Sequence, residues 1–325
     1  MEENLFEQRT DLNALDQAVG QLKTEIGKVI VGQQEMIELL LAGILADGHI
    51  LIEGVPGVAK TLTAKLLSKV ISVNFSRIQF TPDLMPSDVI GTSVFNPRDS
   101  NFEFKHGPIF SNIVLIDEIN RAPAKTQSAL FEVMEERQIT VDGQTYRLLP
   151  PFMVVATQNP IEHEGTYHLP EAQLDRFLFK IKVGYPTQEE EFHIVSNHHL
   201  MKGDQRIDTV GPVLAASKIH ELRDKVRSSH VEDRLIQYIT AIVNATRNHN
   251  AIFLGASPRA SIGILNASKA VAAMRGRDFV TPDDIVYTTP AVLRHRLVLT
   301  PQKEMDGTTV DEVIKEILQS IEIPR

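Results

Sequence analysis

Residues 49–71, HILIEGVPGVAKTLTAKLLSKVI, place a glycine-rich loop between an apolar run and a helical pattern. The apolar run at 49–54 has the length and composition of a buried strand. From Lys60 onward the spacing is helical, so the loop joins a strand to a helix. Two further apolar runs, in NIVLIDEIN and FMVVATQNP, are separated by the helical stretch AKTQSALFEVMEER. This order predicts an α/β fold whose parallel sheet has helices on both faces.

The loop nearly matches the phosphate-binding pattern G-x-x-x-x-G-K-[ST], but Ala59 stands where the pattern has its second glycine. Its backbone N–H groups would face phosphate, Lys60 would reach the β- and γ-phosphates, and Thr61 would offer a hydroxyl to Mg²⁺. We expect Gly57 to need a positive φ or a close backbone approach. Ala59 is expected to begin the helix, where alanine has a better propensity than glycine. A plain Gly/Pro turn followed by Lys-Thr is the alternative. The predicted nucleotide-binding residues here are Gly54, Val55, Pro56, Gly57, Val58, Ala59, Lys60, Thr61 and Leu62.

Polar side chains follow the other two apolar runs. In VLIDEIN, Asp117 is placed to hold Mg²⁺, in part through water, and Glu118 to act as general base on the attacking water. In VVATQNP, Asn159 is placed to orient that water or contact the γ-phosphate. Each residue taken alone is also an ordinary loop or turn residue. Because open parallel sheets bind ligands at the carboxyl ends of their strands, the joint order predicts one nucleotide site.

Two arginines are candidates to stabilise the charge on a transferred phosphoryl group. Arg176 lies in EAQLDRFLF and Arg259 in GASPRAS. Each one alone is equally compatible with a surface position or a salt bridge.

Other patterns predict how the chain is organised. Apolar residues from Leu12 to Val29 recur at helical spacing, which favours a helix packed on the body over a coiled-coil arm. Alternating residues around Asn96-Pro97-Arg98-Asp99 and around Asp142-Gly143 predict two inserted hairpins.

The pattern becomes helical beyond Tyr185-Pro186, with helix-start signals at Thr187, Thr281 and Thr309. We therefore predict a nucleotide-binding core over residues 1–185 and a helical domain over 186–325. The segment 201–212, MKGDQRIDTVGP, is expected to be an exposed connection.

The composition excludes several classes of protein. A chain of 325 residues without cysteine forms no disulfide and no thiolate metal site. The acidic N-terminus and the lack of a long apolar run predict no leader peptide and no membrane insertion, and thus a cytoplasmic protein. A net charge of -9 argues against broad adhesion to nucleic acid.

Taken together, GVPGVAKT, LIDEINRA, ATQNP, LDRF and GASPRA resemble the MoxR family of AAA+ ATPases. The resemblance extends from VIVGQ at Val29 to PAVLRHRL, which ends at Leu297. It implies an AAA+ core with two inserted hairpins, followed by a small all-α lid domain. Alanine before the lysine is common in this family, so Ala59 departs from the generic pattern but not from the pattern of the family.

The resemblance also implies a role for each matching residue. These roles are Walker A for Lys60 and Thr61, Walker B for Asp117 and Glu118, sensor 1 for Asn159, a finger acting on a neighbouring subunit's ATP for Arg176, sensor 2 for Arg259, and adenine contacts for Val31 and Gly32. Arg121, in DEINRA, matches a family position near the subunit interface. Whether sensor 2 acts on its own or a neighbouring chain stays open.

For function, the resemblance implies Mg²⁺-dependent ATP hydrolysis by a homo-oligomeric ring, commonly a hexamer. The ring would remodel or mature a protein client or load a cofactor, with a partner that carries a von Willebrand factor A domain. One alternative is a nucleic-acid motor that grips DNA with its hairpins, where Arg98, Lys105 and Arg147 are offset by nearby acids. The other is an ATP-binding switch or scaffold that recruits a partner, because it would need the same site.

Overall fold

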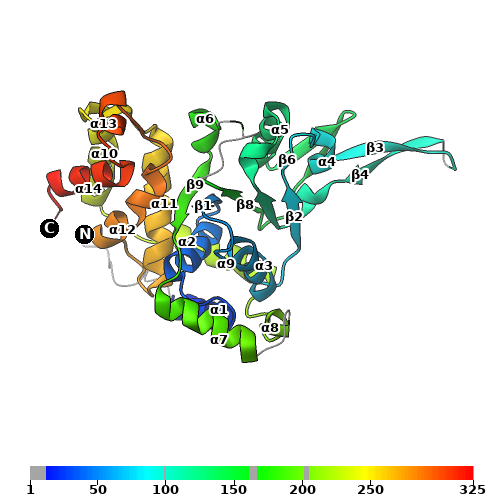
Figure 1. Cartoon of the computed structure of the whole chain (residues 1–325), viewed down its shortest axis with the longest axis horizontal. Helices are drawn as coiled ribbons and strands as arrows, with labels where there is room; N and C mark the ends of the chain where they lie inside the picture. Colours follow the sequence, from blue (N-terminus) through cyan, green and yellow to red (C-terminus); the bar gives the residue numbers. More distant parts are fainter. Residues whose placement is uncertain (1–11, 99, 161–166, 168, 201–204, 325) are drawn as a thin grey trace, which may run out of the picture.

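The centre of the protein is a five-stranded parallel sheet in the order β2-β5-β8-β1-β9 (Figure 1). The structure is a computed structural model that describes residues 12–98, 100–160, 167, 169–200 and 205–324. The strands are β1 (His49–Gly54), β2 (Phe75–Gln79), β5 (Ile113–Asp117), β8 (Met153–Gln158) and β9 (Phe177–Val183). The predicted parallel sheet is confirmed. Its two edge strands, β2 and β9, were not predicted, because Arg77, Lys180 and Lys182 interrupt their apolar residues.

Helices cover both faces of the sheet, as predicted. Along β1, Ile50 and Ile52 pack toward α2 (Gln34–Leu45) and α3 (Lys60–Val70). Between them, Leu51 points to the other face, where α4 (Pro86–Ile90) and α5 (Ala124–Glu136) lie. This alternation follows from the two-residue period of a strand.

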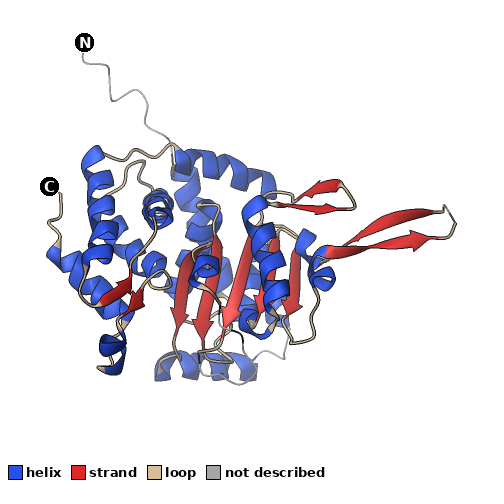
Figure 2. Ribbon diagram, turned by 90° about the horizontal axis from the view of Figure 1, so that it is seen from above, coloured by secondary structure: helices blue, strands red, loops and turns tan. Residues whose placement is uncertain are grey.

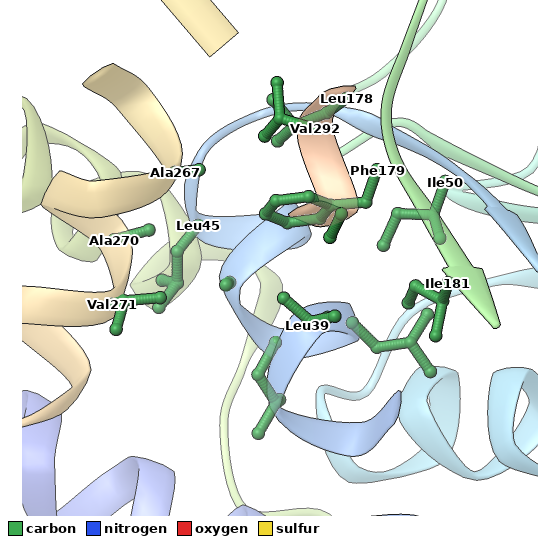
Figure 3. Packing of buried hydrophobic residues seen from close by; sticks show 14 of the residues in the cluster. Leu39, Leu45, Ile50, Leu178, Phe179, Ile181, Ala267, Ala270, Val271 and Val292 are labelled. Carbon is green, nitrogen blue, oxygen red and sulfur yellow. The ribbon is translucent and has the colours of Figure 1, made fainter. Parts of the chain in front are cut away.

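Helix α2 is apolar on nearly every side because it is packed between two layers. Figure 3 shows Leu39 and Leu45 between the sheet residues Ile50 and Ile181 and the small residues of α11 (Pro258–Met274). A helix that is buried all round needs such a pattern. A Cβ on Gly43 would lie 2.5 Å from the side chain of Ile50, so glycine permits the close approach of α2 to β1.

The apolar residues that recur at helical spacing near the N-terminus lie on α1 (Asn13–Gly27), whose buried residues include Leu15, Val19 and Ile26. It packs against α3 and α11, which confirms the predicted helix packed on the body of the protein rather than a coiled-coil arm.

Both predicted hairpins are confirmed. The first is β3 (Gly91–Asn96) with β4 (Asn101–His106), and it projects far from the body (Figure 2). The second is β6 (Gln138–Val141) with β7 (Gln144–Arg147). Its turn residues Asp142 and Gly143 have φ values of 51° and 77°, as a type I′ turn requires. Asp99, at the first predicted turn, lies outside the described residues.

The C-terminal part is mainly helical, with one difference from the prediction. The remaining helices are α6 (Glu171–Leu174), α7 (Gln188–Leu200), α8 (Gln205–Asp208), α9 (Ala216–Arg227), α10 (Asp233–Asn248), α12 (Pro282–Leu293), α13 (Pro301–Met305) and α14 (Val310–Ser320), with short 3₁₀ turns at Pro108–Phe110 and Ile119–Arg121. The predicted starts at Thr281 and Thr309 are confirmed as N-caps. Unexpectedly, β10 (Ile252–Leu254) pairs antiparallel with β11 (Val298–Leu299).

In the described part of 201–212, which the sequence predicts to be an exposed connection, Asp208, Thr209 and Pro212 are exposed, but the segment also packs on the body. Val210 is buried, and the Nζ atom of Lys69 donates a hydrogen bond of 2.6 Å to the carbonyl oxygen of Ile207. Just beyond the segment, the backbone N–H groups of Val213 and Leu214 both donate hydrogen bonds to the carbonyl oxygen of Val70. The segment therefore packs on the end of α3. The division into domains at residue 185 stays a prediction.

Within the described ranges, no helix combines the length and the apolar character that crossing a membrane requires.

Candidate nucleotide site

The glycine-rich loop leaves the sheet at the end of β1. A Cβ on Gly54 would lie 2.7 Å from the carbonyl oxygen of Val183, so only glycine fits beside β9. Gly57 has a φ of 86°, which confirms its expected positive value. The Nζ atom of Lys60 donates a hydrogen bond back to the carbonyl oxygen of Gly54. Within the loop, Pro56 and Gly57 are exposed, as a ligand-binding loop requires.

The expected role of Ala59 as the first helical residue is wrong. Helix α3 begins at Lys60, and Ala59 is its N-cap with a left-handed backbone, φ 61° and ψ 18°. That conformation crowds the Cβ of an L-residue at a cost of roughly 1–2 kcal/mol. The glycine of the generic pattern therefore has a conformational reason that helix propensity alone does not reveal.

We predict that Ala59→Gly stabilises the protein by up to about 1 kcal/mol. Relief of backbone strain should exceed the extra chain entropy of glycine, roughly 0.5–1 kcal/mol. Denaturant unfolding measures the change. As a control, Ala129→Gly inside α5 should cost about 1 kcal/mol. An equal loss in both variants would contradict the left-handed conformation.

Asp117 lies buried at the end of β5, close to the start of α3. The Oγ1 atom of Thr61 is 3.4 Å from each of its carboxylate oxygens. Thr157 donates a hydrogen bond of 3.1 Å to Oδ1, and the Nε atom of Arg77 lies 2.6 Å from Oδ2. A hydroxyl and a carboxylate so close together are the oxygen donors that a hard cation such as Mg²⁺ prefers.

Glu118 is held by partners from three segments. Its backbone N–H donates to the Oγ1 atom of Thr157 at 3.1 Å. Its Oε2 atom accepts a hydrogen bond of 2.7 Å from Gln79 and lies 2.8 Å from the Nε atom of Arg121. With φ 58° and ψ 52°, Glu118 has a left-handed backbone where the chain leaves β5.

Sequence reasoning missed three residues of this site: Arg77, Gln79 and Thr157. The first two belong to β2, whose sequence FSRIQ has too few apolar residues to be predicted as a strand. Thr157 lies inside the quoted VVATQNP, and its place at the end of an apolar run was the available signal.

Asn159 follows β8 directly and is 9% exposed. Because β8 pairs in parallel with both β1 and β5, its end lies at the same edge as Gly54 and Asp117. The structure therefore brings together the loop, the two acids and Asn159, as the order of motifs predicts.

A cavity of about 230 Å³ opens beside the loop. It is lined by Val29, Ile30, Val31, Gln33, Gly57, Val58, Ala59, Leu62, Pro186, Ile194 and Ile207. Mainly apolar walls next to a phosphate loop suit a flat ring such as a purine. Gly32, with φ 67°, instead lines the neighbouring hollow, where an added Cβ would collide with the Glu190 carboxylate. Six of the lining residues were not predicted, because nothing in their sequence marks a ligand contact: Val29, Ile30, Gln33, Pro186, Ile194 and Ile207.

The two arginines lie at the amino ends of the strands, opposite the carboxyl ends where the loop and the acids lie. In the parallel pair β1 and β9, His49 aligns with Phe177 and Gly54 with Val183. Arg176 therefore precedes the amino end of β9, roughly 17 Å, one strand length, from the loop. Figure 1 shows β9 running from α6 at one edge to α7 at the other. The Nη2 atom of Arg259 lies 2.8 Å from Glu135, which Arg176 also approaches. The structure thus groups the arginines with each other and apart from their own chain's loop.

Comparisons with known proteins identify an AAA ATPase core and a lid domain. The model of the ATPase family associated with various cellular activities (AAA) matches residues 49–179, and that of the AAA lid domain matches 244–317. Chaperone MoxR1 of Mycobacterium tuberculosis is 44% identical over 324 residues, covering 97% of this chain and 84% of that protein. The chain belongs to the MoxR family of AAA+ ATPases.

Two further similarities fit this family. Protein YeaC of Bacillus subtilis, described as uncharacterized, is 47% identical over 306 residues, covering 94% of this chain and 95% of that protein. A crystal structure of a candidate ATPase from Cytophaga hutchinsonii superposes with a TM-score of 0.89 at 42% identity, covering 97% of each chain. As a member of the MoxR family, the chain binds nucleotide and hydrolyses ATP.

Proposed function

We propose that this MoxR-family ATPase hydrolyses Mg²⁺-ATP at sites shared between neighbouring copies in a ring, and that this turnover remodels a protein client. One observation carries the proposal: Arg176 and Arg259 lie together a full strand length from the loop that would hold their own chain's phosphates. The candidate site of one chain therefore needs a second chain to be complete.

Within one chain, each residue acts at a defined part of the substrate. Lys60 contacts the β- and γ-phosphates, and Thr61 with Asp117 holds the metal, in part through water. Bound there, Mg²⁺ would neutralise phosphate charge. The 3.4 Å separation of the Thr61 hydroxyl from the Asp117 carboxylate supports this donor pair. The purine ring occupies the cavity that Val31 lines.

The general base is Glu118, and Asn159 orients the attacking water. Gln79 and Arg121 both contact Oε2 of Glu118, so the other carboxylate oxygen, Oε1, is the one that accepts the proton. These two donors fix the direction of the carboxylate, so the base is positioned before substrate arrives.

Arg176 and Arg259 act on the ATP of the next copy, as finger and sensor 2. Such an interface joins unlike surfaces, so it is heterologous and closes into a ring when the rotation permits. We expect six copies, the usual number in this family.

The lid couples hydrolysis to movement because Arg259 lies in the first turn of α11, a helix of the C-terminal part. A lid arginine that contacts the neighbour's γ-phosphate loses this contact after hydrolysis, so the lid shifts relative to that neighbour. The relative named Chaperone MoxR1 supports a protein client. We expect a partner with a von Willebrand factor A domain to deliver that client. The net charge of -9 favours a protein over a nucleic-acid substrate.

The proposal is tested by trapping the client in a single nucleotide state. Glu118→Gln should bind ATP without hydrolysing it and should retain a client that the wild type releases during turnover. Lys60→Ala removes the phosphate contact, so it should bind no ATP and retain nothing. Quantitative mass spectrometry of the captured proteins compares the variants. Equal capture by Lys60→Ala and Glu118→Gln would contradict ATP-driven remodelling.

A further inference from the structure

A single carboxylate on α5 lies between the two arginines. One oxygen of Glu135 is 2.8 Å from the Nη2 atom of Arg259, and the other is 3.7 Å from the Nη1 atom of Arg176. Arg176 also donates to the carbonyl oxygen of Phe131, one turn earlier on the same helix. The side chains of Glu135, Arg176 and Arg259 are 41%, 29% and 52% exposed, so a neighbouring molecule can reach all three.

A second connection joins the backbones that carry these arginines. Asp175 precedes Arg176, and its Oδ2 atom accepts a hydrogen bond of 2.9 Å from Ser257. The hydroxyl of Ser257 in turn caps α11 by accepting the N–H of Arg259. The other oxygen of Asp175 binds the buried side chain of Arg296 at 2.7 Å. The start of α11 is therefore tied to the residue beside the finger.

Two guanidinium groups at one place repel each other unless an acid lies between them. Glu135 supplies one negative charge to two positive ones, so the trio keeps a net charge of +1. Each guanidinium has five N–H donors. The contact with one carboxylate oxygen occupies a small part of this capacity, which leaves donors for a phosphate.

We propose that Glu135 is a positioning residue that holds Arg176 and Arg259 as one unit, so that both reach the same γ-phosphate of a neighbouring copy. This inference rests on the proposed function, because it requires the arginines to act between chains. It adds a residue from α5 that touches neither nucleotide nor metal.

Glu135→Gln tests the inference because glutamine keeps the shape and loses the charge. We expect kcat for ATP to fall about 10- to 100-fold, the scale of a misplaced catalytic group, with KM nearly unchanged. The matched control is Glu132→Gln, which removes the same charge from an exposed position on the same helix. Its kcat should stay within about twofold of the wild type. Thermal unfolding of both variants checks that the fold is intact.

A double-mutant cycle separates positioning from a structural role. In an Arg259→Ala background the 2.8 Å contact is already lost, so Glu135→Gln should reduce kcat by less than about threefold. An undiminished loss in that background would overturn the inference, because Glu135 would then act independently of Arg259. A rise in kcat of Glu135→Gln would overturn it in favour of a latch that restrains the arginines.

The outcomes also separate this inference from the function on which it rests. If Arg176→Ala and Arg259→Ala keep wild-type kcat, the roles of the arginines are wrong and the inference fails with them. If both arginine variants lose turnover while Glu135→Gln matches Glu132→Gln, the positioning inference alone is wrong.

Discussion

Arg176→Ala is expected to lower ATP turnover in the assembled protein roughly 10³- to 10⁵-fold, the range known for arginine fingers. The affinity for ATP should remain close to that of the wild type, because Arg176 lies at the amino edge of the sheet, away from the phosphate loop. Steady-state hydrolysis and equilibrium binding of a fluorescent ATP analogue measure the two quantities separately.

The control for this variant is Arg234→Ala, which removes an exposed arginine at the start of α10. Surface changes of this kind have small effects, so hydrolysis should be retained. Dilution adds a second check, because a finger from another chain matters only in assembled protein. If Arg176→Ala lowers ATP turnover by the same factor in a monomeric preparation, Arg176 acts on its own chain's nucleotide.

Glu118→Gln is expected to reduce turnover about 10²- to 10⁴-fold, the usual contribution of a general base. Glutamine can still accept the hydrogen bond from Gln79, and the backbone N–H of residue 118 still reaches Thr157. The site should therefore keep its shape and bind ATP, but it would lack a group that accepts the proton of water.

Single-turnover hydrolysis is the direct measurement for this variant, because it excludes effects on product release. Glu136→Gln, an exposed change on α5, is the control and should turn over ATP normally. Turnover in Glu118→Gln at the wild-type rate would contradict the role of general base.

The centre of the fold could be predicted from the sequence because buried parallel strands are continuous apolar runs. The runs that became β1, β5 and β8 end in Gly54, Asp117 and Gln158, and their parallel pairing brings the polar residues that follow to one edge. The sequence therefore predicts that the Walker-type residues lie together.

Features that depend on packing between distant segments could not be predicted. Arg77 and Gln79 reach the acids because β2 pairs with β5, and β2 has too few apolar residues to be recognised. The left-handed backbone of Ala59 is a local torsion that helix propensity does not encode. Nothing in the sequence around Glu135 distinguishes it from Glu132 or Glu136, because its two partners come from distant segments, the residue before β9 and the start of α11.

The central claim, a site shared between chains, is tested most directly by mixing two inactive variants. Lys60→Ala lacks the phosphate lysine and retains Arg176, whereas Arg176→Ala has the opposite defect. Mixed one to one as dilute chains and then assembled, they should recover hydrolysis at roughly a quarter of the interfaces, those that combine an intact loop with an intact arginine. A mixture no more active than the separate variants, under conditions where the chains demonstrably co-assemble, would contradict the claim.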